Sequence, residues 1–167
     1  MSRTDPEERA AAPQLLRSPA QLLAFGFGSG LSPLAPGTAG TVAAVPLYLL
    51  LVQLPDILYL LAVLLAAVFG VWICGRASDE LGVHDHPGIV WDEFVGFWIA
   101  AFALPAEPAW VLAAFVVFRI YDILKPWPVS WLDREVEGGA GIMIDDIAAG
   151  LLALATLQMA RYGIALA

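Results

Sequence analysis

The sequence has few of the charged residues that a soluble domain exposes to water. Only 14% of its 167 residues are Asp, Glu, Lys or Arg, whereas 60% are hydrophobic, and the mean hydropathy is +0.77. This composition lies outside the soluble norm and is typical of membrane proteins. We therefore expect a small helical membrane bundle with about five apolar helices and a polar cytoplasmic face.

Cysteine and basic residues are also scarce. Cys74 is the only cysteine, so no internal disulfide can form, and its apolar surroundings predict a small buried side chain. Eight Lys and Arg against sixteen Asp and Glu give a net charge of −8, and the basic residues form no stripe, which argues against a nucleic-acid partner. No short apolar core with a cleavage site follows the acidic first dozen residues, so we expect no cleaved signal peptide.

The chain is short enough for one folding unit only. Residues 1–18 are polar and predict a flexible tail, and residues 19–167 predict a single helical, membrane-embedded catalytic domain. The segment 26–41 holds five glycines and two prolines, which predicts an irregular loop. We expect Thr38 or Thr41 to cap the helix that follows, and the loop's N–H groups to form an anion cradle.

Five apolar runs follow this segment: 42–54, 57–74, 94–104, 109–118 and 147–160. The second run has eighteen residues without a charge and is the strongest spanning signal in the chain. Glycines at 138, 139 and 141 predict a flexible joint before the last run.

The third and fourth runs flank two prolines and Glu107. A single span over both runs would put Glu107 at the membrane centre, at a cost of roughly 2.5–3.5 kcal/mol or more. It would also separate Asp92 from Arg119 by the thickness of the bilayer. We therefore expect a helical hairpin, with arms so short that bilayer thinning, tilt or a re-entrant path must accommodate them.

The charges are distributed unequally between the two sides of this layout. If residues 1–40 are cytoplasmic, every basic residue except Arg161 falls on the cytoplasmic side, as the positive-inside rule requires. All acidic residues except Asp56 and Glu107 fall on the same side. The expected site is therefore cytoplasmic.

Ionisable residues gather where the apolar runs begin or end: His84, Asp85, Asp92, Glu93, Arg119, Asp122, Lys125, Asp145 and Asp146. Carboxylates brought together raise one another's pKa unless a cation joins them. Oxygen ligands without cysteine or a His-x₃-His spacing suit Mg²⁺ rather than zinc. These ionisable residues also have purely structural explanations. Helix N-termini favour carboxylates, and oppositely charged residues three positions apart on a helix form ion pairs. Histidines can hydrogen-bond to the backbone of a loop.

Phosphate chemistry suits this set of residues, because phosphoryl transfer needs a metal and cations around the phosphate oxygens. We expect Mg²⁺ to be held by some of Glu93, Asp122, Asp145 and Asp146. We expect phosphate oxygens to be bound by Arg119, Lys125 and the Thr38 loop, and the proton to be handled by Asp92, Asp85 or His84. Direct attack of water and a phosphoaspartyl intermediate both remain open.

Four groups of segments carry a family resemblance: 26–33 with 36–38, 82–86 with 89–96, 118–128, and 141–150. They resemble the bacterial phosphatidylglycerophosphatase A family over residues 20–160 or so. The resemblance implies an all-α fold and Mg²⁺-dependent removal of the terminal phosphate of phosphatidylglycerophosphate, giving phosphatidylglycerol at the cytoplasmic (inner) membrane. The implied partners are this phospholipid and the membrane, and a homo-oligomer is left open.

Two other functions explain parts of the pattern. A small ion or solute transporter with a charged cytoplasmic vestibule would have charges spread in depth and repeated halves. Here the charges collect on one side, and no internal repeat is evident. A non-enzymatic membrane adaptor would dock through the Trp-rich segment 127–137 and would tolerate Asp→Asn changes at Asp122 or Asp146.

Overall fold

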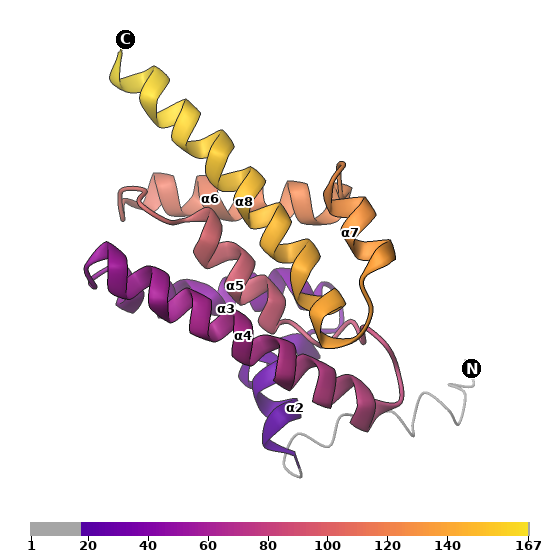
Figure 1. Cartoon of the computed structure of the whole chain (residues 1–167). Helices are drawn as coiled ribbons and strands as arrows, with labels where there is room; N and C mark the ends of the chain where they lie inside the picture. Colours follow the sequence, from indigo (N-terminus) through magenta and orange to yellow (C-terminus); the bar gives the residue numbers. More distant parts are fainter. Residues whose placement is uncertain (1–17, 167) are drawn as a thin grey trace, which may run out of the picture.

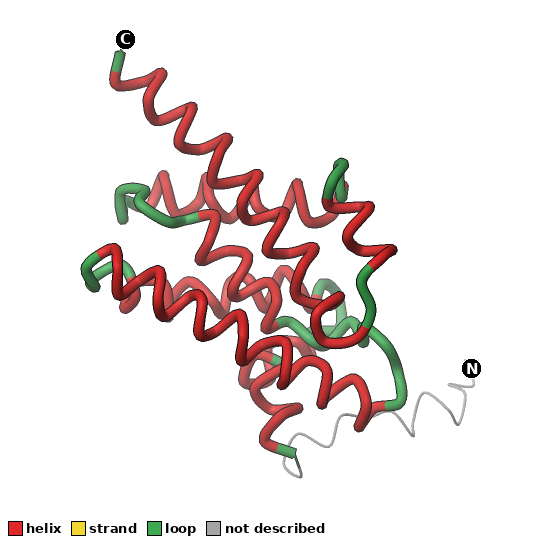
Figure 2. The backbone as a smooth tube through the Cα atoms, in the orientation of Figure 1, coloured by secondary structure: helices red, strands yellow, loops and turns green. Residues whose placement is uncertain are grey.

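The computed structural model describes residues 18–166, which fold into helices joined by turns and loops, without a strand in that range (Figures 1 and 2). The elements, in order, are α2 (Pro19–Ala24), the 3₁₀ segment η1 (Gly26–Leu31), α3 (Pro36–Leu51), α4 (Asp56–Leu81), α5 (Trp91–Ala100), α6 (Pro108–Leu124), α7 (Val129–Glu135) and α8 (Gly138–Ala165). The all-α prediction is confirmed. The predicted tail, residues 1–18, lies outside the described residues except for Ser18, whose side chain caps α2.

Two helices, α4 and α8, are long and apolar enough to cross a membrane. Only 28% of the most apolar stretch of α4 is buried, and Leu64, Val68 and Trp72 are exposed on its outer side. Soluble proteins rarely expose so large an apolar face, which is typical of contact with lipid. The helices α3, α5 and α6 have 16, 10 and 17 residues, fewer than the roughly 20 that a straight span needs. Five membrane spans therefore stay a prediction.

The prediction of an irregular segment over 26–41 is wrong in its second half. The helix α3 begins at Pro36, whose fixed φ suits a first helical turn, and it contains Gly37 and Thr38. The predicted threonine cap is also wrong. Ala35 is the N-cap residue, and the Thr41 hydroxyl donates to the Gly37 carbonyl within the helix at 2.9 Å.

The predicted joint at residues 138–141 is helical instead, because α8 begins at Gly138. A Cβ added at Gly139 would lie 2.0 Å from the carbonyl oxygen of Val71 and 2.8 Å from the amide nitrogen of Gly75. The glycine therefore allows α8 to pack tightly against α4. Asp145 and Asp146 consequently lie about two turns inside α8 rather than at its start.

The apolar stretch 94–118 is interrupted where the two prolines indicated. The helix α5 ends at Ala100, α6 begins at Pro108, and the turn between them includes Ala103 at a φ of 54°. Arg161 of α8 donates a hydrogen bond to the Ala103 carbonyl and so holds this turn against the end of the bundle. The beginning of α5 and the end of α6 lie at the same end of the bundle, because residues of both line one polar cavity.

The short helix α5 is the centre of the bundle and packs against α3, α4, α6 and α8. Phe94, Val95 and Phe97 are fully buried. Its closest approach is to α8, because a Cβ added at Gly150 would lie 2.5 Å from the Gly96 carbonyl oxygen, and one added at Gly96 would lie 2.8 Å from the Asp146 carbonyl oxygen. Only glycine at both positions permits this separation of the two helices.

Replacing Gly150 with valine should therefore force α5 and α8 apart. We expect Gly150→Val to lower the free energy of unfolding by about 1–3 kcal/mol, the usual cost of overpacking a core. Helical circular dichroism during denaturant unfolding in detergent micelles measures this change. Gly163→Val is the matched control in the same helix, because a Cβ there meets nothing within 4 Å. Equal stability of the two variants would contradict the tight contact.

Candidate functional site

A polar cavity of about 290 Å³ lies where the beginnings of α3 and α5, the end of α6 and the early turns of α8 meet. Eight of the ten residues that the sequence proposes for a site line it: Asp85, Asp92, Glu93, Arg119, Asp122, Lys125, Asp145 and Asp146. Segments more than fifty residues apart thus contribute to one site.

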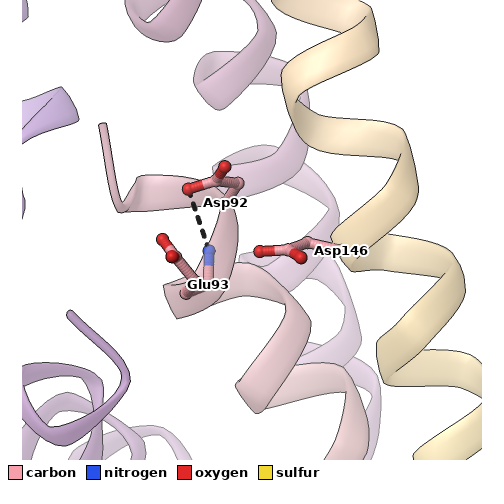
Figure 3. A group of neighbouring side chains, drawn as sticks. All are labelled: Asp92, Glu93 and Asp146. Atoms are coloured by element: carbon pink, nitrogen blue, oxygen red, sulfur yellow. Dashed lines mark hydrogen bonds between the residues drawn. The ribbon is translucent and has the colours of Figure 1, made fainter. Parts of the chain in front are cut away.

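Three carboxylates form the tightest group in this cavity. Asp92, Glu93 and Asp146 each offer an oxygen, and these three atoms lie within 4.8 Å of one another. Figure 3 shows Asp92 and Glu93 on the first turn of α5 and Asp146 reaching toward them from α8. Asp92 Oδ1 accepts a hydrogen bond from the Glu93 amide at 3.1 Å, and the dipole of α5 favours both negative charges.

Burial makes these negative charges costly in the absence of a cation. Asp92 and Asp146 are only 8% and 3% exposed. Burial and the Glu93 charge raise the pKa of Asp92 well above its ordinary value, and burial and the Asp146 charge raise the pKa of Glu93 to about 8. A bound cation would remove this cost, because an opposite charge within a few ångströms favours the ionised form.

The chemistry of the donor set fits such a cation. Glu93 Oε2 is buried and accepts no hydrogen bond, so it is an acceptor that lacks a positive partner. All three side chains offer oxygen, the ligand that hard divalent cations prefer. The cluster of Asp92, Glu93 and Asp146 could therefore hold a metal ion.

Arg119 lies beside this cluster on α6. Its Nη1 pairs with Asp122, one turn further along the helix, and lies 3.6 Å from Glu93 Oε1. However, Nε and Nη1 are buried and donate no hydrogen bond of good geometry. Buried guanidinium donors of this kind fit the oxygens of a phosphate.

Gly37 in the first turn of α3 makes room for this pair. A Cβ added there would lie 2.2 Å from Glu93 Oε1 and 3.1 Å from the Arg119 Nη atoms. The glycine thus lets the backbone of α3 cover the two side chains. Pro36 and Gly37 are also part of the cavity lining, so the backbone of α3 forms one of its walls.

Lys125 is the second cation of the cavity and ends α6 in a left-handed conformation, with φ 41°. It donates to Asp133 of α7 and to Asp145 Oδ2 of α8, the latter at 2.7 Å. Burial lowers the pKa of Lys125, but these two carboxylates more than offset that effect and raise it. The ammonium group therefore stays charged and joins three helices.

Two of the proposed site residues do not line the cavity. His84 Nε2 accepts a hydrogen bond from the amide of Gly138 at 3.0 Å, so it binds the first residue of α8. Thr38 follows Gly37 in α3 and does not contribute to the lining. Asp85 does line the cavity, from a loop position with φ 49°.

Sequence reasoning missed the residues that shape the site without ligating anything. Gly37, Gly96 and Gly150 set the separations between helices, and Asp133 pairs with Lys125. An isolated glycine inside an apolar helical run is a signal of close backbone packing and could have indicated Gly96 and Gly150. Asp133 lies in the Trp-rich segment 127–137, and nothing in the neighbouring sequence indicated its pairing with Lys125.

Comparison with known proteins identifies close relatives of this chain. The family described as Phosphatidylglycerophosphatase A matches residues 22–161. A phosphatidylglycerophosphatase A from Escherichia coli (strain K12) is 53% identical over 143 residues, covering 85% of this chain and 83% of the relative. The Haemophilus influenzae protein of the same name is 44% identical over 149 residues, covering 88% and 91%. A Bacteroides thetaiotaomicron protein, provisionally named a phosphatidylinositol-3-phosphatase, is 39% identical over 150 residues, covering 84% and 92%. No solved structure matches the chain.

Metal binding should stabilise the fold, and more so at higher pH. Carboxylates must lose their protons to bind a metal, and the pKa of Glu93 near 8 means that protons compete below that pH. At a hundredfold excess over the Kd, Mg²⁺ should add about 2.7 kcal/mol to the free energy of unfolding. Thermal unfolding in detergent with and without Mg²⁺, at pH 6 and pH 8.5, tests this. We expect the larger shift in Tm at pH 8.5.

The control for this experiment is Asp79→Asn, which changes an exposed carboxylate of α4 outside the cavity. It should keep the full Mg²⁺ shift, whereas Asp146→Asn should lose most of it. An equal shift in both variants would show that the ion binds elsewhere.

Proposed function

The chain belongs to the phosphatidylglycerophosphatase A family, and on this basis we propose that it hydrolyses the terminal phosphomonoester of phosphatidylglycerophosphate with the help of Mg²⁺. The products are phosphatidylglycerol and phosphate. One observation carries the proposal: a buried carboxylate cluster and an arginine whose buried Nε makes no hydrogen bond share one cavity. A metal on one side and a guanidinium on the other suit a phosphate between them.

We assign the metal to Asp92, Glu93 and Asp146, the three residues whose oxygens converge. A bound Mg²⁺ would neutralise charge on the phosphate oxygens, and both direct attack of water and a phosphoaspartyl intermediate are compatible with this arrangement. Two further carboxylates, Asp122 and Asp145, were expected among the ligands. Their contacts support another task, because Asp122 pairs with Arg119 and Asp145 pairs with Lys125.

Arg119 is the residue that we assign to phosphate binding. Its buried Nε makes no hydrogen bond, and Nη1 pairs with Asp122 and lies near Glu93 without donating a hydrogen bond of good geometry to either. Lys125 adds positive charge at the edge of the cavity, with its ammonium group fixed by two carboxylates. Both cations thus have orienting carboxylates, and neither has to be ordered by the substrate.

We assign proton transfer to Asp85, which would either protonate the leaving alcohol or deprotonate the attacking water. It lines the cavity from the loop before α5, outside the group of three converging carboxylates. Asp92 belongs to the metal group, and His84 accepts the amide of Gly138 at the start of α8. In this assignment His84 positions α8, and therefore Asp145 and Asp146, rather than exchanging protons with the substrate.

We propose that residues 19–167 form one catalytic domain in the bacterial inner membrane, with several spans and the site on the cytoplasmic face. The grouping of the far-side residues supports this topology. A cavity of about 520 Å³ at the other end of α5 brings together Asp56, Arg161 and the turn before α6. Asp56 and Arg161 are two of the three charged residues that the positive-inside layout leaves on the opposite face. A homo-oligomer stays open.

Phosphate release from phosphatidylglycerophosphate in detergent micelles tests the assignment of the metal. Asp92→Asn and Asp146→Asn should each reduce kcat/KM at least 100-fold, since even residues that only orient a metal ligand typically contribute 10- to 100-fold. Asp79→Asn should retain full activity. Full turnover in EDTA would remove the metal from the mechanism.

Arg119→Lys tests the role of the guanidinium. Lysine keeps the charge but loses the planar donors, so we expect a loss of about 1.5–3 kcal/mol, roughly 10- to 150-fold in kcat/KM. The Mg²⁺ shift in Tm should persist in this variant. Arg76→Lys, at an exposed ion pair with Glu80 on α4, is the control and should behave as wild type. An unchanged kcat/KM in Arg119→Lys would contradict the assignment.

A further inference from the structure

A second cavity, of about 420 Å³, lies between α3 and α6. The described residues that line it are all apolar, and six of them form its two walls: Val42, Val45 and Leu49 of α3, and Val111, Leu112 and Phe115 of α6. These two helices make few contacts with each other, which leaves the groove open between them. Nothing in the reaction described above uses this groove.

The groove and the polar cavity share the same two helices. Gly37 of α3 and Arg119 of α6 line the polar cavity. Val42 follows Gly37 by five residues, and Phe115 precedes Arg119 by four, which places the near end of the groove about 6–8 Å along the helices from the site. Leu49 and Val111 lie further in the same direction, so the groove runs away from the polar cavity along the bundle.

We propose that this groove binds one acyl chain of the phospholipid whose phosphomonoester occupies the polar cavity. The inference rests on the proposed function and adds a binding site for the hydrocarbon part of the substrate. A ligand with a phosphate at one end and hydrocarbon at the other matches the order of the two cavities. A glycerol, a phosphodiester and a second glycerol separate the terminal phosphate from the acyl chains, and this flexible linker can bend to reach from the polar cavity to the neighbouring groove.

The order of the cavities also favours this occupant over a second protein chain. A docking protein helix would have to enter the groove beside the ionised residues of the site. A lipid chain enters along the bundle from its apolar outer surface, to which Val42 and Leu112 of the groove walls are themselves exposed. The groove then fixes the lipid's direction and brings its head group to Arg119.

The test uses water-soluble phosphatidylglycerophosphates with acyl chains of four, six and eight carbons, each below its micelle concentration. Burying one methylene changes binding about fourfold, so wild-type kcat/KM should rise steeply with chain length. Val45→Trp and Leu112→Trp fill the groove from either wall. Each should lower the ratio of kcat/KM for the eight-carbon substrate to that for the four-carbon substrate at least tenfold. The Mg²⁺ shift in Tm of both variants should equal that of the wild type, which shows that the variants fold and keep the polar cavity.

The matched control is Leu64→Trp on the outer face of α4, which should keep the wild-type dependence on chain length. An unchanged dependence in both groove variants, or an equal loss for all three substrates, would overturn the proposal. If the wild type hydrolyses none of the substrates, the proposed function fails instead, and photolabelling decides the groove separately.

Photolabelling uses phosphatidylglycerophosphate with a diazirine at the end of one chain. We expect label on peptides of α3 and α6, and loss of this label when excess six-carbon substrate competes. Label spread over α4 and α8, or label that persists under competition, would mean that bulk lipid fills the groove and would overturn the proposal. Cross-links between two copies of the chain through α3 and α6 would overturn it in favour of a dimer interface.

Discussion

The contact between α5 and α8 is the constraint on which the site depends. Gly96 and Gly150 bring the two backbones so close that no larger residue fits between them. Asp92 and Glu93 lie one turn before Gly96, and Asp146 lies one turn before Gly150. The three carboxylates converge because the glycines set the distance between their helices, and a wider separation would place them on independent surfaces.

Charge balance accounts for the pairing of the other ionised residues that line the polar cavity. Six carboxylates line it together with only two basic residues, Arg119 and Lys125. Each basic residue has its own carboxylate partner, Asp122 and Asp145 respectively, and the remaining negative charge concentrates at the buried cluster. A metal ion bound by the cluster would offset this charge, and in the proposed function the buried guanidinium of Arg119 then binds a phosphate oxygen. The acidic lining of the cavity is thus compatible with the proposed phosphate site, provided that a cation occupies the cluster.

The sequence predicted the type of fold and most of the residues that line the polar cavity, because both depend on local composition. Apolar runs with charges at their ends indicate helices with a polar face, and the charges in those positions proved to share one cavity. The predictions that were wrong concern features that depend on contacts between distant segments. Residues 138–141 read as a joint, since the need for glycine against Val71 and Gly75 exists only once α4 lies beside α8. The backbone contact of His84 and the pairing of Asp133 with Lys125 had no local signal either.

The most direct measurement of the central claim is an anomalous difference map from crystals of the protein soaked in Mn²⁺, which substitutes for Mg²⁺ at oxygen sites. The account predicts one strong peak within about 2.5 Å of carboxylate oxygens of Asp92, Glu93 and Asp146. A peak elsewhere in the chain, or a structure in which Asp146 points away from the first turn of α5, would contradict it.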